Sequence, residues 1–148
     1  MEKLRKRLVP ASYVMLINAN NEVLLLRRFN TGYQDGMYML PAGHLEPNET
    51  FTQAVVREAQ EEVGVVIKSD DVEIVHVMNR LGPGEDNERI DVFFSASRWQ
   101  SEPAIMEPDK CDDVRWFPLN NLPEAISPYI RHAIDCIAKK VYYSEDGF

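Results

Sequence analysis

Residues 43–65 read GHLEPNETFTQAVVREAQEEVGV, and this stretch decides the fold around it. Thr50 and Gln53 have the spacing of a capping box, in which each side chain bonds to the other residue's backbone N–H. A helix should therefore begin near Thr50. It should run to Val63, because Gly64 supplies the residue that commonly ends a helix in the left-handed conformation.

Acidic side chains share one face of this predicted helix. With 100° of rotation per residue, Glu58, Glu61 and Glu62 fall within an arc of about 100°. Arg57 lies four residues before Glu61 and can pair with it. The neighbouring arc holds the aliphatic side chains expected to pack on the core: Val56, Ala59 and Val63.

The acidic face has two interpretations. Glutamate is a good helix former, so REAQEE alone is compatible with a solvated face. Gly43 and Glu49, at fixed spacing ahead of the helix, favour a metal site instead, because a divalent cation relieves the repulsion between crowded carboxylates. An all-oxygen site suits Mg²⁺ better than zinc. A glycine at position 43 also lets a backbone carbonyl and a substrate approach the metal closely.

The rest of the chain alternates short β-rich runs with turns. The expected strands are 13–18, 23–26, 37–40, 72–78, 90–96 and 114–117. The first two should form a hairpin across the turn-rich residues 18–21. Residues 29–36 and 81–87 should be loops, a second helix is predicted over 129–141, and the tail 142–148 should be frayed. This mixture predicts a single α/β (α+β) domain over residues 1–148.

Composition and charge restrict the classes of function that we expect for this chain. A chain of 148 residues can bury a substantial core. Its net charge of −8 argues against nucleic-acid or membrane binding as the main role, although bound cations would still admit a polyanionic substrate. No apolar run reaches transmembrane length, and Pro10 interrupts the start that a signal peptide would need, so a first strand is favoured. Cys111 and Cys136 lack CxxC spacing and are interpreted as reduced thiols of a cytoplasmic protein.

At residues 43–65 the sequence resembles the Nudix hydrolase family. The family's box is G-x5-E-x7-R-E-U-x-E-E-x-G-U, where U is aliphatic. The chain matches every specified place, at Gly43, Glu49, Arg57, Glu58, Ala59, Glu61, Glu62, Gly64 and Val65. Weaker similarity to the MutT-like branch extends over most of the chain. The resemblance implies an α/β/α sandwich around a mixed β-sheet, and hydrolysis of a nucleoside diphosphate linked to another moiety.

The resemblance also implies a metal centre. The cofactor would be Mg²⁺, for which Mn²⁺ can substitute. Arg57 would orient the glutamates, and Glu49 would brace the loop before the helix. Glu58 is also a candidate general base that accepts a proton from the attacking water. The ligands implied are Glu58, Glu61, Glu62, Glu107 on a late loop, and the carbonyl of Gly43 or of Ala42 beside it.

Other residues are candidates for substrate binding. Arg28 aligns with a phosphate-contacting arginine of the family, although Arg27 beside it could serve instead. His44 departs from the Lys or Gly common at its place; it contacts phosphate, assists a proton transfer or only occupies the loop. Tyr33 is a stacking candidate because its loop follows a strand end. Ile126 stands where the branch that cleans oxidised guanine nucleotides can carry a base-reading asparagine, which puts that specificity in doubt.

Several functions stay open at this point. The leading substrate is a nucleoside triphosphate, cleaved to monophosphate and pyrophosphate, and the closest rival is a nucleotide sugar such as ADP-ribose. A non-catalytic nucleotide-sensing module is a third reading, and diphosphate isomerase chemistry, with Cys111 near Glu107, is a fourth. The expected partner is a small nucleotide, with no stable nucleic-acid or membrane binding, and the resemblance allows a homodimer. Spacing alone does not settle whether Arg89 and Asp91 pair or line a groove.

Overall fold

A computed structural model describes residues 2–84 and 87–148. The strands, in chain order, are β1 (Val9–Leu16), β2 (Glu22–Arg28), β3 (Tyr38–Met39), β4 (Ala42–His44), β5 (Glu73–Leu81), β6 (Glu88–Ala96), β7 (Cys111–Pro118) and β8 (Tyr143–Asp146). The helices are α1 (Phe51–Val63) and α2 (Pro128–Ala138), with a short 3-10 turn, η1 (Ser69–Asp71), before β5.

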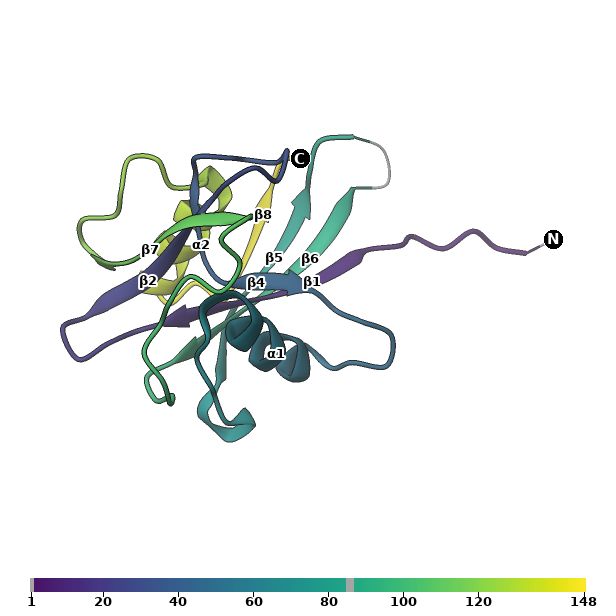
Figure 1. The fold of residues 1–148 in the computed structure, drawn as a ribbon. Coiled ribbons are helices and arrows are strands. Elements are labelled where there is room, and N and C mark those ends of the chain that lie inside the picture. The colour runs from purple at the N-terminus through teal and green to yellow at the C-terminus, as the bar shows by residue number, and fades with distance from the viewer. Residues whose placement is uncertain (1, 85–86) are drawn as a thin grey trace.

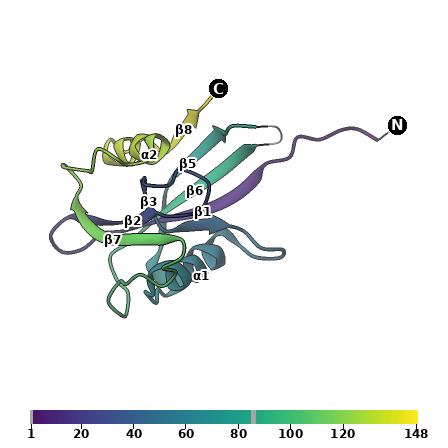
Figure 2. The ribbon, with the colours of Figure 1, turned by 45° about the horizontal axis from the view of Figure 1, so that its top comes forward.

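The strands form two sheets between two helices. One sheet has the order β4-β1-β6-β5-β8 and the other the order β3-β2-β7. The larger sheet is mixed, because β1 runs parallel to β6 and β5 parallel to β8, whereas β5 and β6 are antiparallel. Figure 1 shows the strands between the helices, and the turned view of Figure 2 places α2 and α1 on opposite sides of them. The predicted α/β/α sandwich is therefore confirmed, with its strands divided between two sheets.

Alternation along the strands divides the core in two. On β2, Leu24 and Leu26 pack in a cluster with the buried face of α1, whereas Val23 and Leu25 pack in a second cluster with α2. Successive side chains of a strand point to opposite faces, so one strand can serve both layers. By the same alternation, Arg28 is the next residue of β2 on the α1 side.

Helix α1 follows the sequence prediction closely. Thr50 caps it by accepting from the backbone N–H of Gln53, and the Gln53 side chain accepts from the backbone N–H of Thr50, so the capping box is present. Gly64 ends the helix in the left-handed conformation with φ 75°. The residues predicted for its core stripe lie inward, with Ala59 and Val63 fully buried.

The expected hairpin between the first two strands is wrong. The chain does reverse there, since the Asn18 N–H donates to Glu22 O at 3.1 Å and Ile17 bridges to Val23. Beyond that bridge β1 pairs with β6 and β4, and β2 pairs with β7 and β3. Both strands are buried on both faces over most of their length, so each requires cover that a two-stranded hairpin cannot supply.

The expected frayed tail is also wrong. Residues 143–146 form β8, which pairs in parallel with β5 at the edge of the larger sheet. His76 holds this strand in place: its ring Nε2 lies 2.7 Å from Ser144 Oγ, and its Nδ1 lies 2.8 Å from Val141 O. Hydrogen bonds hold this strand, and a stripe of apolar residues does not. The sequence therefore shows no marked apolar alternation that would have predicted it.

Smaller differences concern strand and loop limits. Of the run 37–40, only Tyr38–Met39 form a strand, β3, and a bend at Pro41 separates it from β4 at Ala42–His44. The loop predicted over 29–36 is confirmed, whereas residues 85–86 of the loop at 81–87 lie outside the described residues. Cys111 and Cys136 are both free thiols, as expected. Within the part of the chain that the structure describes, no helix is both long and apolar enough to cross a membrane.

Candidate active site

Arg57 joins the loop before α1 to the acidic face of that helix. Its Nε donates to Glu49 Oε2 at 2.8 Å and its Nη2 to Glu49 Oε1 at 2.9 Å, a bidentate pair. Its Nη1 donates to Glu58 at 2.7 Å and to Glu61 at 3.2 Å, and its Nη2 reaches the His44 carbonyl at 3.2 Å. Hydrogen bonds from Arg57, then from the Glu46 N–H, lower the pKa of Glu49 to about 2.

Glu58 and Glu62 form a close carboxyl pair beside β4. The two carboxyl groups are close enough for each to affect the pKa of the other, and Glu62 Oε1 accepts from the Ala42 N–H at 3.0 Å. Burial, followed by the charge of Glu58, raises the pKa of Glu62 well above its usual range. Burial also raises the pKa of Glu58, against the opposing effect of Arg57. The two raised pKa values have one cause, because burial makes two neighbouring negative charges costly.

Gly43 completes this acidic site. A Cβ added at Gly43 would overlap the Glu58 carboxylate, so only glycine leaves room for Glu58 against β4. Gly43 pairs with Ser12 of β1, whose hydroxyl donates to Phe51 O at 2.8 Å and ties the strand to the start of α1. The glycine therefore allows the Glu58 carboxylate of α1 to lie against the backbone of β4.

These donors fit a hard divalent cation. The set consists of carboxylate and carbonyl oxygens, and a cation would offset the repulsion between the buried Glu58 and Glu62 carboxylates. Over residues 2–84 and 87–148, however, no three His, Cys, Asp or Glu side chains already converge in ligand geometry. The reason is visible at Glu61, whose half-exposed side chain turns to Arg57. Two of the three expected helix ligands are therefore together, and Glu61 is beside them.

The loop carrying Glu107 is anchored to the end of α1. The Ala104 N–H donates to Val63 O at 3.0 Å, and the sulfur of Met106 would lie 3.0 Å from a Cβ at Gly64. Glu107 is close enough for its charge to contribute to the raised pKa of Glu62. Its side chain also lies 3.7 Å from Lys110 Nζ. The structure thus brings the predicted loop carboxylate near the helix carboxylates.

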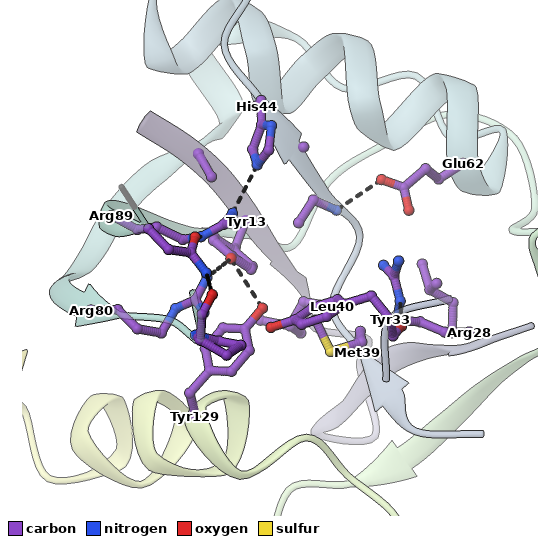
Figure 3. A pocket seen from close by; sticks show the side chains of 16 residues that line it. Tyr13, Arg28, Tyr33, Met39, Leu40, His44, Glu62, Arg80, Arg89 and Tyr129 are labelled. Carbon is purple, nitrogen blue, oxygen red and sulfur yellow. Dashed lines mark hydrogen bonds between the residues drawn. The ribbon is translucent and has the colours of Figure 1, made fainter. Parts of the chain in front are cut away.

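A cavity of about 370 Å³ opens beside this acidic site. Among the predicted site residues, it is lined by Gly43, His44, Glu62, Arg28 and Tyr33. In Figure 3, Arg28, Tyr33 and Glu62 lie on one side of the cavity, and Arg80 and Arg89 on the other. The metal-binding candidates therefore form one part of the wall of a space large enough to admit a small molecule.

The two neighbouring arginines of β2 have different environments. Arg28 lines the cavity, with its Nε donating to Tyr33 O at 2.6 Å and its guanidinium carbon 5.4 Å from the centre of the Tyr33 ring. Arg27 points to the opposite face, where it pairs with Asp112 at 2.7 Å, and it is not among the residues that line this cavity. The geometry favours Arg28 of the two phosphate-binding candidates.

His44, at the end of β4, connects that strand to the β5–β6 hairpin. Its Nε2 lies 2.9 Å from Arg89 Nη1. Because a guanidinium can only donate, the ring nitrogen accepts, which places the proton of a neutral imidazole on Nδ1. Burial, followed by the charge of Arg89, lowers the pKa of His44. His44 therefore presents a neutral ring to the cavity, with Arg89 fixed beside it.

Arg80 is a cavity residue that sequence reasoning missed. The structure also answers the question left open for Asp91, which pairs with Arg80 at 2.6 Å and not with Arg89. A signal was available, because Arg80 follows His76 and Met78 at the two-residue period of a strand, on the buried face of β5. A charged residue in such a row indicates either a buried pair or a ligand site.

Several further residues have structural roles. Trp99 and Trp116 stack on each other with ring centres 5.8 Å apart, beside the core on the α1 side. Ile126 is 2 % exposed and packs in the core on the α2 side. Burial raises the pKa of the Cys111 thiol, which donates to Asp113 O, while its backbone N–H bonds Glu107 O. A buried thiol with a raised pKa is a poor nucleophile, so the geometry does not favour isomerase chemistry.

Comparisons with known proteins identify the family of the chain. The NUDIX domain family model matches residues 7–135. The chain is 32% identical over 117 residues to the NAD-capped RNA hydrolase NudC of Pseudomonas putida, covering 78% of this chain and 38% of that protein. It is 34% identical over 131 residues to the NudC of Pseudomonas aeruginosa, covering 87% of this chain and 44% of the relative. The chain thus spans less than half the length of these relatives.

Solved structures share the fold. A MutT NUDIX hydrolase from Burkholderia pseudomallei superposes with a TM-score of 0.79 at 22% identity, over 87% of this chain and 97% of that one. The NUDIX domain of Shewanella oneidensis NrtR, complexed with ADP ribose, superposes with a TM-score of 0.72 at 21% identity, over 92% and 89% of the two chains. The family model, the relatives and the arrangement around Arg57 agree: the chain belongs to the Nudix hydrolase family.

Proposed function

We propose that this protein hydrolyses a pyrophosphate bond in a nucleoside diphosphate linked to another group. The leading substrate is a nucleoside triphosphate, cleaved to the monophosphate and pyrophosphate. The observation that carries the proposal is the placement of Glu62 and Arg28 in the wall of one cavity, with Glu58 paired to Glu62 behind it. A carboxylate pair that binds cations and a guanidinium that binds phosphate are the two requirements for holding a polyphosphate.

The residues of the chain divide the work among them. Glu58, Glu62, Glu107 and the Gly43 carbonyl would hold Mg²⁺, with Glu61 moving from Arg57 to join them. The ion would neutralise phosphate charge and lower the pKa of water. Arg57 holds Glu58 in place through its bond at 2.7 Å, and Glu49 in turn holds Arg57. Arg28 would bind phosphate oxygens, for which its remaining N–H groups are suited.

Glu58 is our candidate for the general base. It lies next to the cavity wall, and its pKa is raised by burial toward the range in which a carboxylate accepts a proton from water. Arg57 prevents that rise from becoming large, because its charge favours the ionised carboxylate. These two opposing effects leave Glu58 both ionised and able to accept a proton.

A second candidate substrate has the pyrophosphate bond between two nucleosides or between a nucleoside and a sugar. The NudC relatives are named for NAD-capped RNA, and one structural neighbour holds ADP ribose. Both ligands contain the same nucleoside diphosphate core as the leading substrate. These substrates differ in the group that follows the second phosphate. Which substrate the protein prefers therefore depends on the cavity wall opposite Arg28.

The test is product release from a panel of normal and oxidised nucleoside triphosphates, ADP-ribose, NAD and dinucleoside polyphosphates. Each would be assayed with Mg²⁺, with Mn²⁺ and with chelator. We expect metal-dependent turnover of one class, with nucleoside triphosphates best. Tight binding without turnover across the panel would instead favour a nucleotide-sensing module.

A further inference from the structure

The Arg80–Asp91 pair lies almost fully buried in the wall of the cavity. The side chain of Arg80 is 4% exposed and that of Asp91 is 0% exposed, and Arg80 Nε donates to Asp91 Oδ2 at 2.6 Å. The Arg80 guanidinium carbon lies 3.9 Å from the centre of the Tyr129 ring, and Nη2 reaches the Tyr13 hydroxyl at 3.4 Å. Four elements therefore fix this guanidinium: β1, β5, β6 and α2.

Burying this pair is expensive, and its cost is not explained by packing. A buried ion pair often contributes no more stability than apolar side chains of the same size would. Among the described residues, Asp91 Oδ1 is a buried oxygen with no hydrogen-bond partner. Tyr13, Asp91 and Tyr129 occupy one edge and one face of the guanidinium, while Arg80 remains part of the cavity wall. An arrangement this costly and this rigid is typical of a binding site.

The chemistry of the pair indicates which ligand group it suits. Asp91 balances the charge of Arg80, so the pair offers N–H donors without a net positive charge. Such a donor attracts a neutral acceptor, for instance a ring carbonyl, more selectively than it attracts phosphate. The pair also lies across the cavity from Arg28 and Glu62, where the phosphates are expected (Figure 3). A nucleotide whose phosphates lie at Arg28 would extend its base toward Arg80.

We propose that Arg80, held by Asp91, is the specificity-determining residue that donates a hydrogen bond to a carbonyl oxygen on the nucleobase. The inference rests on the proposed function, since it assumes that a nucleotide occupies the cavity. It favours bases with a ring carbonyl, such as guanine and uracil, over adenine, which has none. Ile126, where an asparagine was considered as base reader, is buried in the core. The proposal therefore assigns recognition of the base to Arg80 of β5, across the cavity from Arg28.

Binding measured by calorimetry tests this assignment separately from turnover. The wild-type protein should bind GDP and UDP roughly 10- to 100-fold more tightly than ADP, the usual range for a hydrogen bond from a charged donor. Arg80→Met should remove most of that preference. Arg115→Met is the matched control, because Arg115 also pairs with an aspartate, Asp113 at 2.7 Å, but lies outside the cavity. It should leave the preference unchanged.

A ligand series on the wild-type protein guards against misfolding of Arg80→Met. The diphosphate of 2-aminopurine riboside lacks the 6-oxygen of guanine, whereas inosine diphosphate keeps it and lacks only the 2-amino group. The first should bind like ADP and the second like GDP. Equal or tighter binding of ADP, no binding of any of these diphosphates, or an unchanged preference in a folded Arg80→Met protein would overturn the proposal. Selective binding without turnover would instead contradict the proposed hydrolysis and leave the base preference supported.

Discussion

Arg57 and Glu49 form a two-point hydrogen-bonded pair, at 2.8 and 2.9 Å, between the helix α1 and the loop that precedes it. The same guanidinium also contacts Glu58, Glu61 and the His44 carbonyl. A planar guanidinium that is held at one edge has a fixed direction for its remaining donors. Glu49 therefore determines where Arg57 points, and Arg57 determines where Glu58 lies.

Glu49→Gln should reduce turnover while leaving the protein folded. An amide can accept only one of the two Arg57 bonds, so the guanidinium loses its fixed orientation. Loss of a residue that supports metal ligands typically reduces activity about 10- to 100-fold. Steady-state kinetics and circular dichroism would measure the two effects. Glu46→Gln is the matched control, because Glu46 is exposed and lies 3.8 Å from the same arginine, and a similar loss in that variant would contradict the role given to Glu49.

Glu62→Gln and Glu61→Gln should each lower metal-dependent turnover by roughly a hundredfold or more, because each removes a ligand charge. We expect the loss to be larger for Glu62, which is buried and paired with Glu58, than for Glu61, which is half exposed. Metal titrations of activity would show weaker apparent binding in both. Glu102→Gln, at an exposed loop position, provides the control. Wild-type turnover in both motif variants would refute the metal-site assignment.

Gly43→Ala should separate function from stability. The new methyl group would overlap the Glu58 carboxylate, which is the flexible end of a side chain and can move aside. We therefore expect a change of less than about 1 kcal/mol in the free energy of unfolding, as for mutations without a large packing defect. Apparent metal affinity should fall about 10- to 100-fold. Urea unfolding and metal titration would measure both quantities, and unaltered metal affinity would show that Gly43 has no role in the metal site.

His76 should make the stability of the protein depend on pH. It is 1% exposed, and burial lowers its pKa below the ordinary value of 6.5. As the pH falls below 6.5, the unfolded chain binds a proton at this position before the folded chain does, so the free energy of unfolding decreases. Urea unfolding at pH 7.5 and 5.5 should show a smaller decrease in His76→Gln than in the wild type. An equal decrease in the two proteins would show that His76 does not cause it.

The sequence predicted the local parts of this site well. Thr50, Gln53 and Gly64 mark the limits of α1 through interactions within a few residues, so spacing was sufficient to place them. The same holds for the contact of Arg57 with Glu61, which are neighbours on the helix surface. The choice between Arg27 and Arg28 was out of reach, because it depends on which face of β2 meets α1 and which meets α2.

Long-range pairing accounts for what the sequence did not predict. The strands β1 and β2 separate because each pairs with a strand distant in the chain. β1 pairs with β6, and β2 pairs with β7. Arg80 and Asp91 are eleven residues apart and meet only because β5 and β6 pair in the observed register. Spacing alone could not show that Asp91 would face Arg80 and not Arg89.

The strand β8 forms one edge of the larger sheet. It covers the backbone edge of β5, whose N–H and C=O groups would otherwise offer a template for a strand from another molecule. Its cover is only four residues long and is held through His76, Val141 and Ser144. We therefore expect that release of this segment would leave the backbone of β5 open to pairing with a strand of another molecule.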